Sequence, residues 1–160
     1  MDLEYDVAAI IGAGLLGGLI MVVPLYMGRA MAPQQMRMDL LLLLGTMTPM
    51  RLPLPAAYLA GGMMHAGASV LFAFVHVGLF EVTGINADLV LWGLLFGLGH
   101  WVISGMMMGM MPLLHPLVAK GEMENPGPFA LNMGPMTAMG FLMLHLLFGV
   151  AVGGLYEAFL

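Results

Sequence analysis

The residues best suited to chemistry in this chain are three histidines set in long apolar stretches, His65, His100 and His145. Neutral imidazole is the commonest protein ligand for zinc, copper and iron, and an ionisable side chain inside a membrane is usually paired or functional. Met64 and Met107 lie close by in the sequence and could add thioether sulfurs, which suit Cu(I). The pattern therefore suggests a copper-type metal site.

The same histidines allow three other interpretations. Haem could bind between His65 and His145, with room left by Gly61, Gly149 and Gly153, but no Arg or Lys lies in the apolar stretches to meet its propionates. Proton or quinone chemistry is another possibility. The plainest alternative is structural: a buried imidazole that bonds to a serine or to a backbone carbonyl contributes about 1 kcal/mol of helix association.

The other two histidines look less like ligands. His76 lies three helical turns beyond His65, and we expect a polar contact near the outer surface of the membrane. His115 lies between two prolines, and we expect it at the membrane interface. Away from their ends, where Glu81 lies, the apolar stretches contain no Asp, Glu, Lys or Arg, and no phosphate-binding loop, zinc-protease motif or catalytic triad is present. We therefore expect no catalytic activity from this chain on its own and no ion-coupled transport.

The elements that hold these residues must be membrane helices. Of 160 residues, 61% are hydrophobic and 8% are charged, whereas a soluble domain has about 25% charged residues. With four Lys and Arg together and no Cys, the chain is neither a nucleic-acid binder with a basic face nor a disulfide-stapled module. The composition predicts an all-α membrane protein that lies in lipid.

A bilayer core of ~30 Å needs about 20 apolar residues in a helix. Four segments are long enough, at residues 7–27, 56–82, 89–114 and 129–155. They predict a four-transmembrane-helix bundle that forms one domain over residues 1–160. The run from Leu40 to Leu44 is too short to span, so we expect an interfacial or re-entrant turn or the extension of a neighbouring helix.

Charge sets the predicted orientation. With four spans, one face carries all the basic residues, Arg29, Arg37, Arg51 and Lys120, and the other carries Asp2, Glu4, Asp6, Glu81, Asp88 and Glu157. The positive-inside rule makes the basic loops cytoplasmic. We therefore predict both termini outside, in a bacterial inner membrane.

Recurring landmarks suggest an internal repeat of two helical hairpins, at residues 7–82 and 89–157. The matching pairs are Pro24 with Pro112, the G-x-M-T-x-M blocks that start at Gly45 and Gly134, and His65 with His145. Both hairpins would run in the same direction, as in the parallel repeats of some transporters.

Each predicted span carries small residues on one stripe, which lets membrane helices approach closely. The glycines expected at helix contacts are Gly14, Gly18, Gly61, Gly97, Gly149 and Gly153. Because the three candidate histidines lie on these stripes at similar depth, to within one helical turn of ~5 Å, we expect them inside the bundle.

The glycine-rich first span ending at Pro24, the Met38-Asp39-Leu40 and Gly45-Thr46-Met47 stretches, and the spacing of His145, Gly149, Gly153 and Tyr156 resemble those of small uncharacterised four-helix bacterial membrane proteins. The resemblance covers most of the chain and implies the fold but no activity. Our first functional prediction is an accessory or scaffold subunit of a larger membrane complex, or a homo-oligomer. The alternatives are a copper- or haem-binding membrane module and a small-solute channel or carrier.

Overall fold

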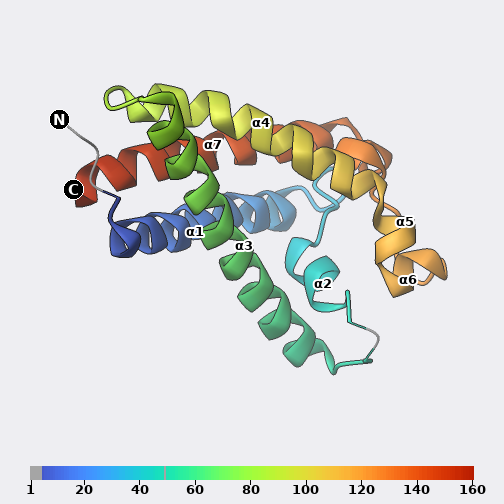
Figure 1. Ribbon diagram of the computed structural model, residues 1–160. Helices are drawn as coiled ribbons and strands as arrows, with labels where there is room; N and C mark the ends of the chain where they lie inside the picture. Colours follow the sequence, from blue (N-terminus) through green and yellow to red (C-terminus); the bar gives the residue numbers. More distant parts are fainter. Residues whose placement is uncertain (1–4, 49) are drawn as a thin grey trace.

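The computed structural model describes residues 5–48 and 50–160, and these residues form helices and loops without a β-strand (Figure 1). The long helices are α1 Val7–Met31, α3 Leu54–Thr83, α4 Leu89–Gly109 and α7 Pro135–Phe159. The short ones are α2 Leu40–Gly45, α5 Met111–Leu114, α6 Pro116–Ala119 and the 3-10 helix η1 Pro128–Met133. Within the described residues, the four long helices are long and apolar enough to cross a membrane, which indicates a membrane protein.

Local sequence determines where these helices start and stop. The carboxylate of Asp6 caps α1 by accepting hydrogen bonds from the backbone N–H groups of Ala8 and Ala9, at 2.7 and 3.0 Å. α3 ends at Gly84, whose φ of 71° is a left-handed conformation that glycine adopts without strain. Asp2 and Glu4, which count in the predicted charge asymmetry, and Pro49 of the first threonine block lie outside the described residues.

Two helices differ in extent from the predicted spans. The span predicted at 89–114 is divided, because α4 ends at Gly109 and Pro112, which has no N–H to donate, lies in the separate helix α5. The span predicted to begin at Phe129 begins instead at Pro135, after Gly134 with a φ of 96°. Phe129 has a φ of 54° and lies in η1, outside any α-helix. Prolines thus shift both helix ends, since proline favours the first turn of a helix and disrupts its interior.

Glycine backbones bring the long helices together. The structure places the predicted packing glycines at helix contacts: Gly14 and Gly18 of α1 against α3, Gly61 of α3 against α2, and Gly97, Gly149 and Gly153 between α4 and α7. A Cβ at Gly149 would overlap the carbonyl oxygen of Gly93, and one at Gly153 would overlap that of Leu89. These pairs also show that α4 and α7 run antiparallel.

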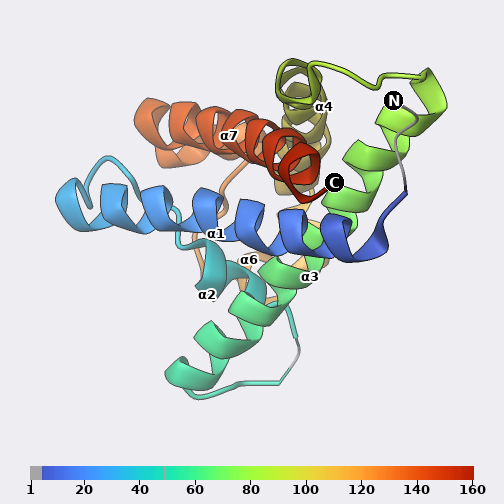
Figure 2. The same cartoon turned by 90° about the vertical axis from the view of Figure 1, so that its left-hand side faces the viewer.

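The long helices are not equally packed. α7 packs along both α1 and α4, whereas α3 crosses α1 obliquely and makes few contacts with α4 or α7 (Figures 1 and 2). α3 and α4 therefore diverge from the short connection between them, as Figure 1 shows. Because α1 and α4 are both antiparallel to α7, they run in the same direction, whereas α3 runs against α1.

The short helix α2 lies against the first half of α3, where Gly45 and Gly61 allow backbone contact. Asp39 caps α2 through a 3.2 Å hydrogen bond from the backbone N–H of Leu42. Its carboxylate also accepts hydrogen bonds from the hydroxyls of Tyr26 and Tyr58, both at 2.7 Å. The apolar run 40–44, predicted as a turn or a helix extension, is thus a separate short helix, and the hydrogen bonds of Asp39 connect it to α1 and α3.

The segments that carry the basic residues lie together at one end of the molecule. Arg51 pairs with Glu122 at 2.9 Å, and Arg37 pairs with Glu124, so the connection from α1 to α3 touches the connection from α6 to η1. His115 is buried, and its Nε2–H donates to the carbonyl of Leu43 at 2.9 Å. His115 is thus a buried link between α2 and α6, where the sequence suggested an interfacial side chain.

The internal repeat stays a prediction. Each half contains a long helix, short helical turns and a second long helix. The matching threonine blocks, however, lie in different settings: Gly45 ends α2, whereas Gly134 precedes α7 and Thr137 lies in the first turn of that helix.

Candidate functional site: a histidine-lined cavity

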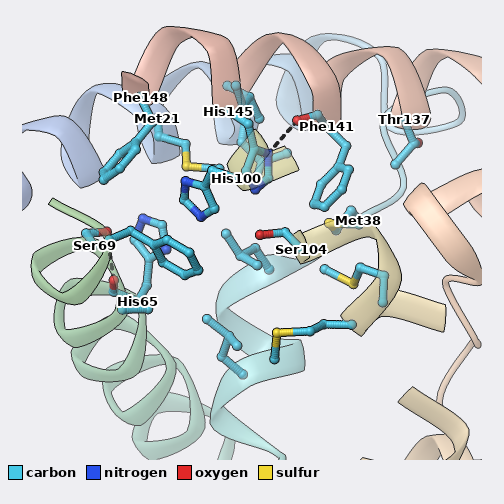
Figure 3. A pocket seen from close by; sticks show the side chains of 18 of the residues that line it. Met21, Met38, His65, Ser69, His100, Ser104, Thr137, Phe141, His145 and Phe148 are labelled. Atoms are coloured by element: carbon cyan, nitrogen blue, oxygen red, sulfur yellow. Dashed lines mark hydrogen bonds between the residues drawn. The ribbon is translucent and has the colours of Figure 1, made fainter. Parts of the chain in front are cut away.

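A cavity of about 170 Å³ lies between α1, α2, α3, α4 and α7 (Figure 3). Its polar lining residues are His65, Ser69, His100, Ser104, Thr137 and His145, and its sulfur-bearing lining residues are Met21, Met38, Met107, Met108 and Met111. The rest of the wall is leucine, phenylalanine and alanine. The three histidines singled out in the sequence, which come from three different helices, therefore share one cavity.

His100 and His145 face each other because α4 and α7 approach so closely. Their ring centroids are 4.7 Å apart, with the ring planes at 82°. His100 also stacks on Phe72 of α3, with centroids 3.6 Å apart and planes at 17°. The Nδ1–H of His145 donates to the carbonyl of Phe141, one turn earlier in α7, at 2.7 Å. His145 therefore has a fixed ring orientation, and its Nε2 lies at the ring edge away from its own backbone.

His65 of α3 lines the cavity and is hydrogen-bonded to α1. Its Nε2–H donates to the carbonyl of Gly18 at 3.1 Å, and the hydroxyl of Ser69 donates to the carbonyl of His65 at 2.8 Å. Gly18 allows this contact since a Cβ there would collide with the Ser69 side chain. The α1–α3 crossing thus positions the third imidazole.

The structure adds a fourth histidine, for which the sequence suggested only a polar contact near the outer surface of the membrane. His76 is 1% exposed, its ring centroid is 5.8 Å from that of His100, and its Nδ1–H donates to the carbonyl of Phe72 at 2.7 Å. Its spacing from His65 could have predicted this position. Eleven residues at about 100° each return the side chain to within ~20° of the same helix face. We call His65, His76, His100 and His145 the histidine cluster.

The two methionines considered as extra ligands lie in different places. Met107 lines the cavity, whereas Met64 is 40% exposed and is not among the lining residues. Met38 lines the cavity from the connection between α1 and α2, where helix periodicity in the sequence gives no guide to side-chain position, and Met111 lines it from the first residue of α5. The sulfur lining therefore comes mostly from residues that the sequence analysis did not single out.

The lining and the volume of the cavity can be compared with what a metal ion or haem would need. Within residues 5–48 and 50–160, no group of three or more His, Asp or Glu side chains is arranged to hold a metal ion. An apolar protein cavity of about 150 Å³ accommodates one benzene ring, so a volume of about 170 Å³ is far too small for a porphyrin. Haem therefore does not fit between His65 and His145 in this arrangement.

No charged side chain lines the cavity among the residues that the structure describes. Asp39 pairs with Arg29 at 3.0 Å, and the two ion pairs that join the connections at that end hold Arg37 and Arg51. The groups in the cavity that can move a proton are thus imidazoles and hydroxyls.

In comparisons with known proteins, no family model, curated sequence or solved structure matches this chain.

Proposed function

We propose that this protein is a non-catalytic subunit of a membrane complex, and that its histidine-lined cavity binds a small molecule of single-ring size. The observation that carries the proposal is the cavity itself: about 170 Å³, walled by Phe, Leu and Met, with imidazoles at one place in an apolar surface. Ligand sites in proteins have this composition, mostly apolar with a few convergent polar groups.

The cavity reaches the exposed surface of the long helices. Ala68 of α3 and Met107 of α4 both line the cavity and both are exposed. In a bilayer this exposed surface faces the hydrocarbon, so an apolar ligand can enter sideways without crossing water. A cavity that opens to lipid suits a membrane-soluble ligand better than an ion.

Binding is favoured over catalysis by what lines the cavity. The described residues of its wall offer imidazoles and hydroxyls, and none of them is a carboxylate or an amine that could assist an imidazole in acid–base chemistry. The role of subunit is supported by the large apolar area left on the helices, including Leu59 at 67%, Met63 at 70% and Leu71 at 61% exposed. Neighbouring helices could cover these faces in an assembly, as lipid does for a single chain.

A copper-type site is the second candidate function, and the sulfur lining favours it. Cu(I) binds thioethers and imidazoles, and Met107, Met108 and Met111 share the cavity with His100 and His145. Metal analysis of the protein purified in mild detergent tests this candidate. Stoichiometric copper that is lost in His100→Ala and His145→Ala would support it, and the absence of copper after loading with Cu(I) would eliminate it.

A small apolar probe tests the binding proposal. Titration of the protein in detergent with fluorobenzene, followed by ¹⁹F NMR, should show saturable binding beyond partition into micelles. Ala68→Trp places a large side chain at the opening and should reduce binding at least tenfold. Leu71→Trp adds the same side chain on the exposed surface outside the cavity lining and should leave binding unchanged. Equal binding by both variants would contradict the proposal.

A further inference from the structure

We propose that the ligand of this cavity is a phenolic ring, whose hydroxyl group donates a hydrogen bond to the histidine cluster. This inference rests on the proposed function and specifies the chemical class of its ligand. It follows from which ring nitrogens of the four imidazoles carry a proton, and from which of these N–H groups already donate to backbone carbonyls of the protein.

Three of the four imidazoles have a defined tautomer, because a backbone carbonyl can only accept a hydrogen bond. His65 bonds the carbonyl of Gly18 through Nε2, and His76 and His145 bond the carbonyls one turn before them through Nδ1. Each of these ring nitrogens must therefore carry the proton. A neutral imidazole has one N–H, so the opposite nitrogen of each ring is left as an acceptor.

With His100 included, the histidine cluster has more free hydrogen-bond acceptors than free donors. His100 is 9% exposed, and its buried Nδ1 has no hydrogen-bond partner in the described part of the chain. The buried Nε2 of His76 also has no partner there. Four neutral imidazoles hold four N–H groups and four lone pairs. Three N–H groups are bound to carbonyls, which leaves one N–H, on His100, against four lone pairs, and three of those lone pairs belong to histidines that line the cavity.

The imidazoles stay neutral in this setting. None of the described lining residues is acidic, and an isolated cation in an apolar interior is strongly unfavourable. The cluster therefore cannot satisfy its own acceptors by taking up protons. Ser104 adds one hydroxyl that can donate or accept, and it leaves the excess of acceptors in place.

A ligand that donates matches this excess, whereas a ligand that only accepts has just the single free N–H of His100 to bond. The Nε2 of His145 lies at the ring edge away from its helix, and His145 lines the cavity, so this acceptor is available to a hydroxyl. A carbonyl or ether oxygen placed there would face a lone pair and lose its hydrogen bond to water without replacement. The phenylalanines of the wall, Phe72, Phe141 and Phe148, suit an aromatic ring.

The test compares two ligands of similar shape, 4-fluorophenol, which donates a hydrogen bond, and 4-fluoroanisole, which does not. Binding to the full chain in detergent is followed by ¹⁹F NMR, with the shift in micelles alone subtracted. One neutral hydrogen bond to a buried acceptor should make 4-fluorophenol bind about three- to tenfold more tightly. His145→Phe removes the acceptor that faces away from α7 and should reduce this preference while 4-fluoroanisole still binds.

The outcomes separate this inference from the proposed function. Equal or tighter binding of 4-fluoroanisole by the unmodified chain, with fluorobenzene still bound, would overturn the inference and leave the cavity proposal standing. Failure of all three fluorinated rings to bind would overturn the proposed function itself. The comparison in the unmodified chain decides the matter even if His145→Phe does not fold.

Discussion

At the scale of single residues, Asp39 has the largest set of hydrogen-bond partners among the charged side chains that the structure describes. It accepts from Tyr26, Tyr58 and the backbone of Leu42, and it pairs with Arg29 at 3.0 Å. These partners lie on α1, α2 and α3, and α2 supplies Leu40 and Leu44 to the cavity wall. One carboxylate therefore connects three elements next to the cavity.

Replacement of this residue should be costly. We expect Asp39→Ala to lower the free energy of unfolding by about 1–3 kcal/mol, because two tyrosine hydroxyls and an arginine lose a shared, partly buried partner. Arg51→Ala removes an ion pair whose arginine side chain is 78% exposed, and it should cost less than about 1 kcal/mol. Denaturant unfolding in detergent measures both. Equal losses would mean that the Asp39 network adds nothing beyond an exposed ion pair.

Part of the candidate site could be predicted from the sequence at this scale. His65, His100 and His145 lie on stripes of small residues at similar depth, and all three line one cavity in the structure. The proton arrangement could not be predicted, since it depends on the carbonyl oxygens that Gly18 and Phe141 present. His76 was missed because the predicted depth of its helix suggested a position near the outer surface.

At the scale of elements, close approach between backbones governs how α4 and α7 pack. Gly93, Gly149 and Gly153 bring the two helices to a distance that any Cβ would prevent. Within a bilayer this contact replaces hydrophobic expulsion as the source of association. It also determines the separation of the His100 and His145 rings.

A matched pair of glycine variants tests this packing. Gly149→Ala should lower the free energy of unfolding by about 1–3 kcal/mol, because the added methyl group overlaps the carbonyl of Gly93. Gly99→Ala lies on α4 with open space around it and should be neutral or stabilising by up to ~1 kcal/mol. Thermal unfolding in detergent compares the two. If both variants behave alike, the α4–α7 contact is not limited by backbone distance.

The sequence predicted long apolar helices, and it misplaced some of their ends. The sequence stays hydrophobic through Met111 and Leu113, so composition alone predicted a third span that continues to residue 114. In the structure, Pro112 divides this span, and α4 ends at Gly109. The stretch before Pro135 is similar: Phe129 and Ala130 are apolar but have left-handed φ values of 54° and 59°. Backbone geometry near proline, which hydropathy does not register, accounts for both differences.

At the scale of the whole molecule, the ion pairs that join the two basic segments bear on the topology. Segments on opposite sides of a bilayer could not touch, so the contact between Arg51 and Glu122 agrees with the prediction that both connections lie on one side. The start of α1 and the end of α7 also lie together, with Gly12 close to the Phe159 ring. The sidedness itself rests on the charge pattern of the sequence.

Labelling in intact cells tests that orientation. We predict that a cysteine at Glu157 reacts with a membrane-impermeant maleimide from outside, and that a cysteine at Lys120 reacts only after the membrane is opened, because basic loops are retained inside. The chain has no native cysteine to interfere. The reverse pattern of labelling would mean that the termini are cytoplasmic.

The proposed role as a subunit makes a prediction at the same scale. Purification from the native membrane in mild detergent should yield the chain with defined partner chains in fixed stoichiometry. Replacement of the exposed Met63 by Trp should weaken that association if partner helices cover this face, while thermal stability of the isolated chain stays unchanged. Isolation as a monomer from membranes cross-linked before extraction would argue against a subunit role.

The central claim is that the histidine-lined cavity holds a single aromatic ring, and the location of a bound ring tests it most directly. Bromobenzene bound to crystals of the protein gives an anomalous signal that marks the bromine position. We expect a bromine peak inside the cavity, between His65 of α3 and the facing His100 and His145. A peak only on the outer helix surfaces, or a cavity closed by its own side chains, would show that the cavity does not hold an aromatic ring.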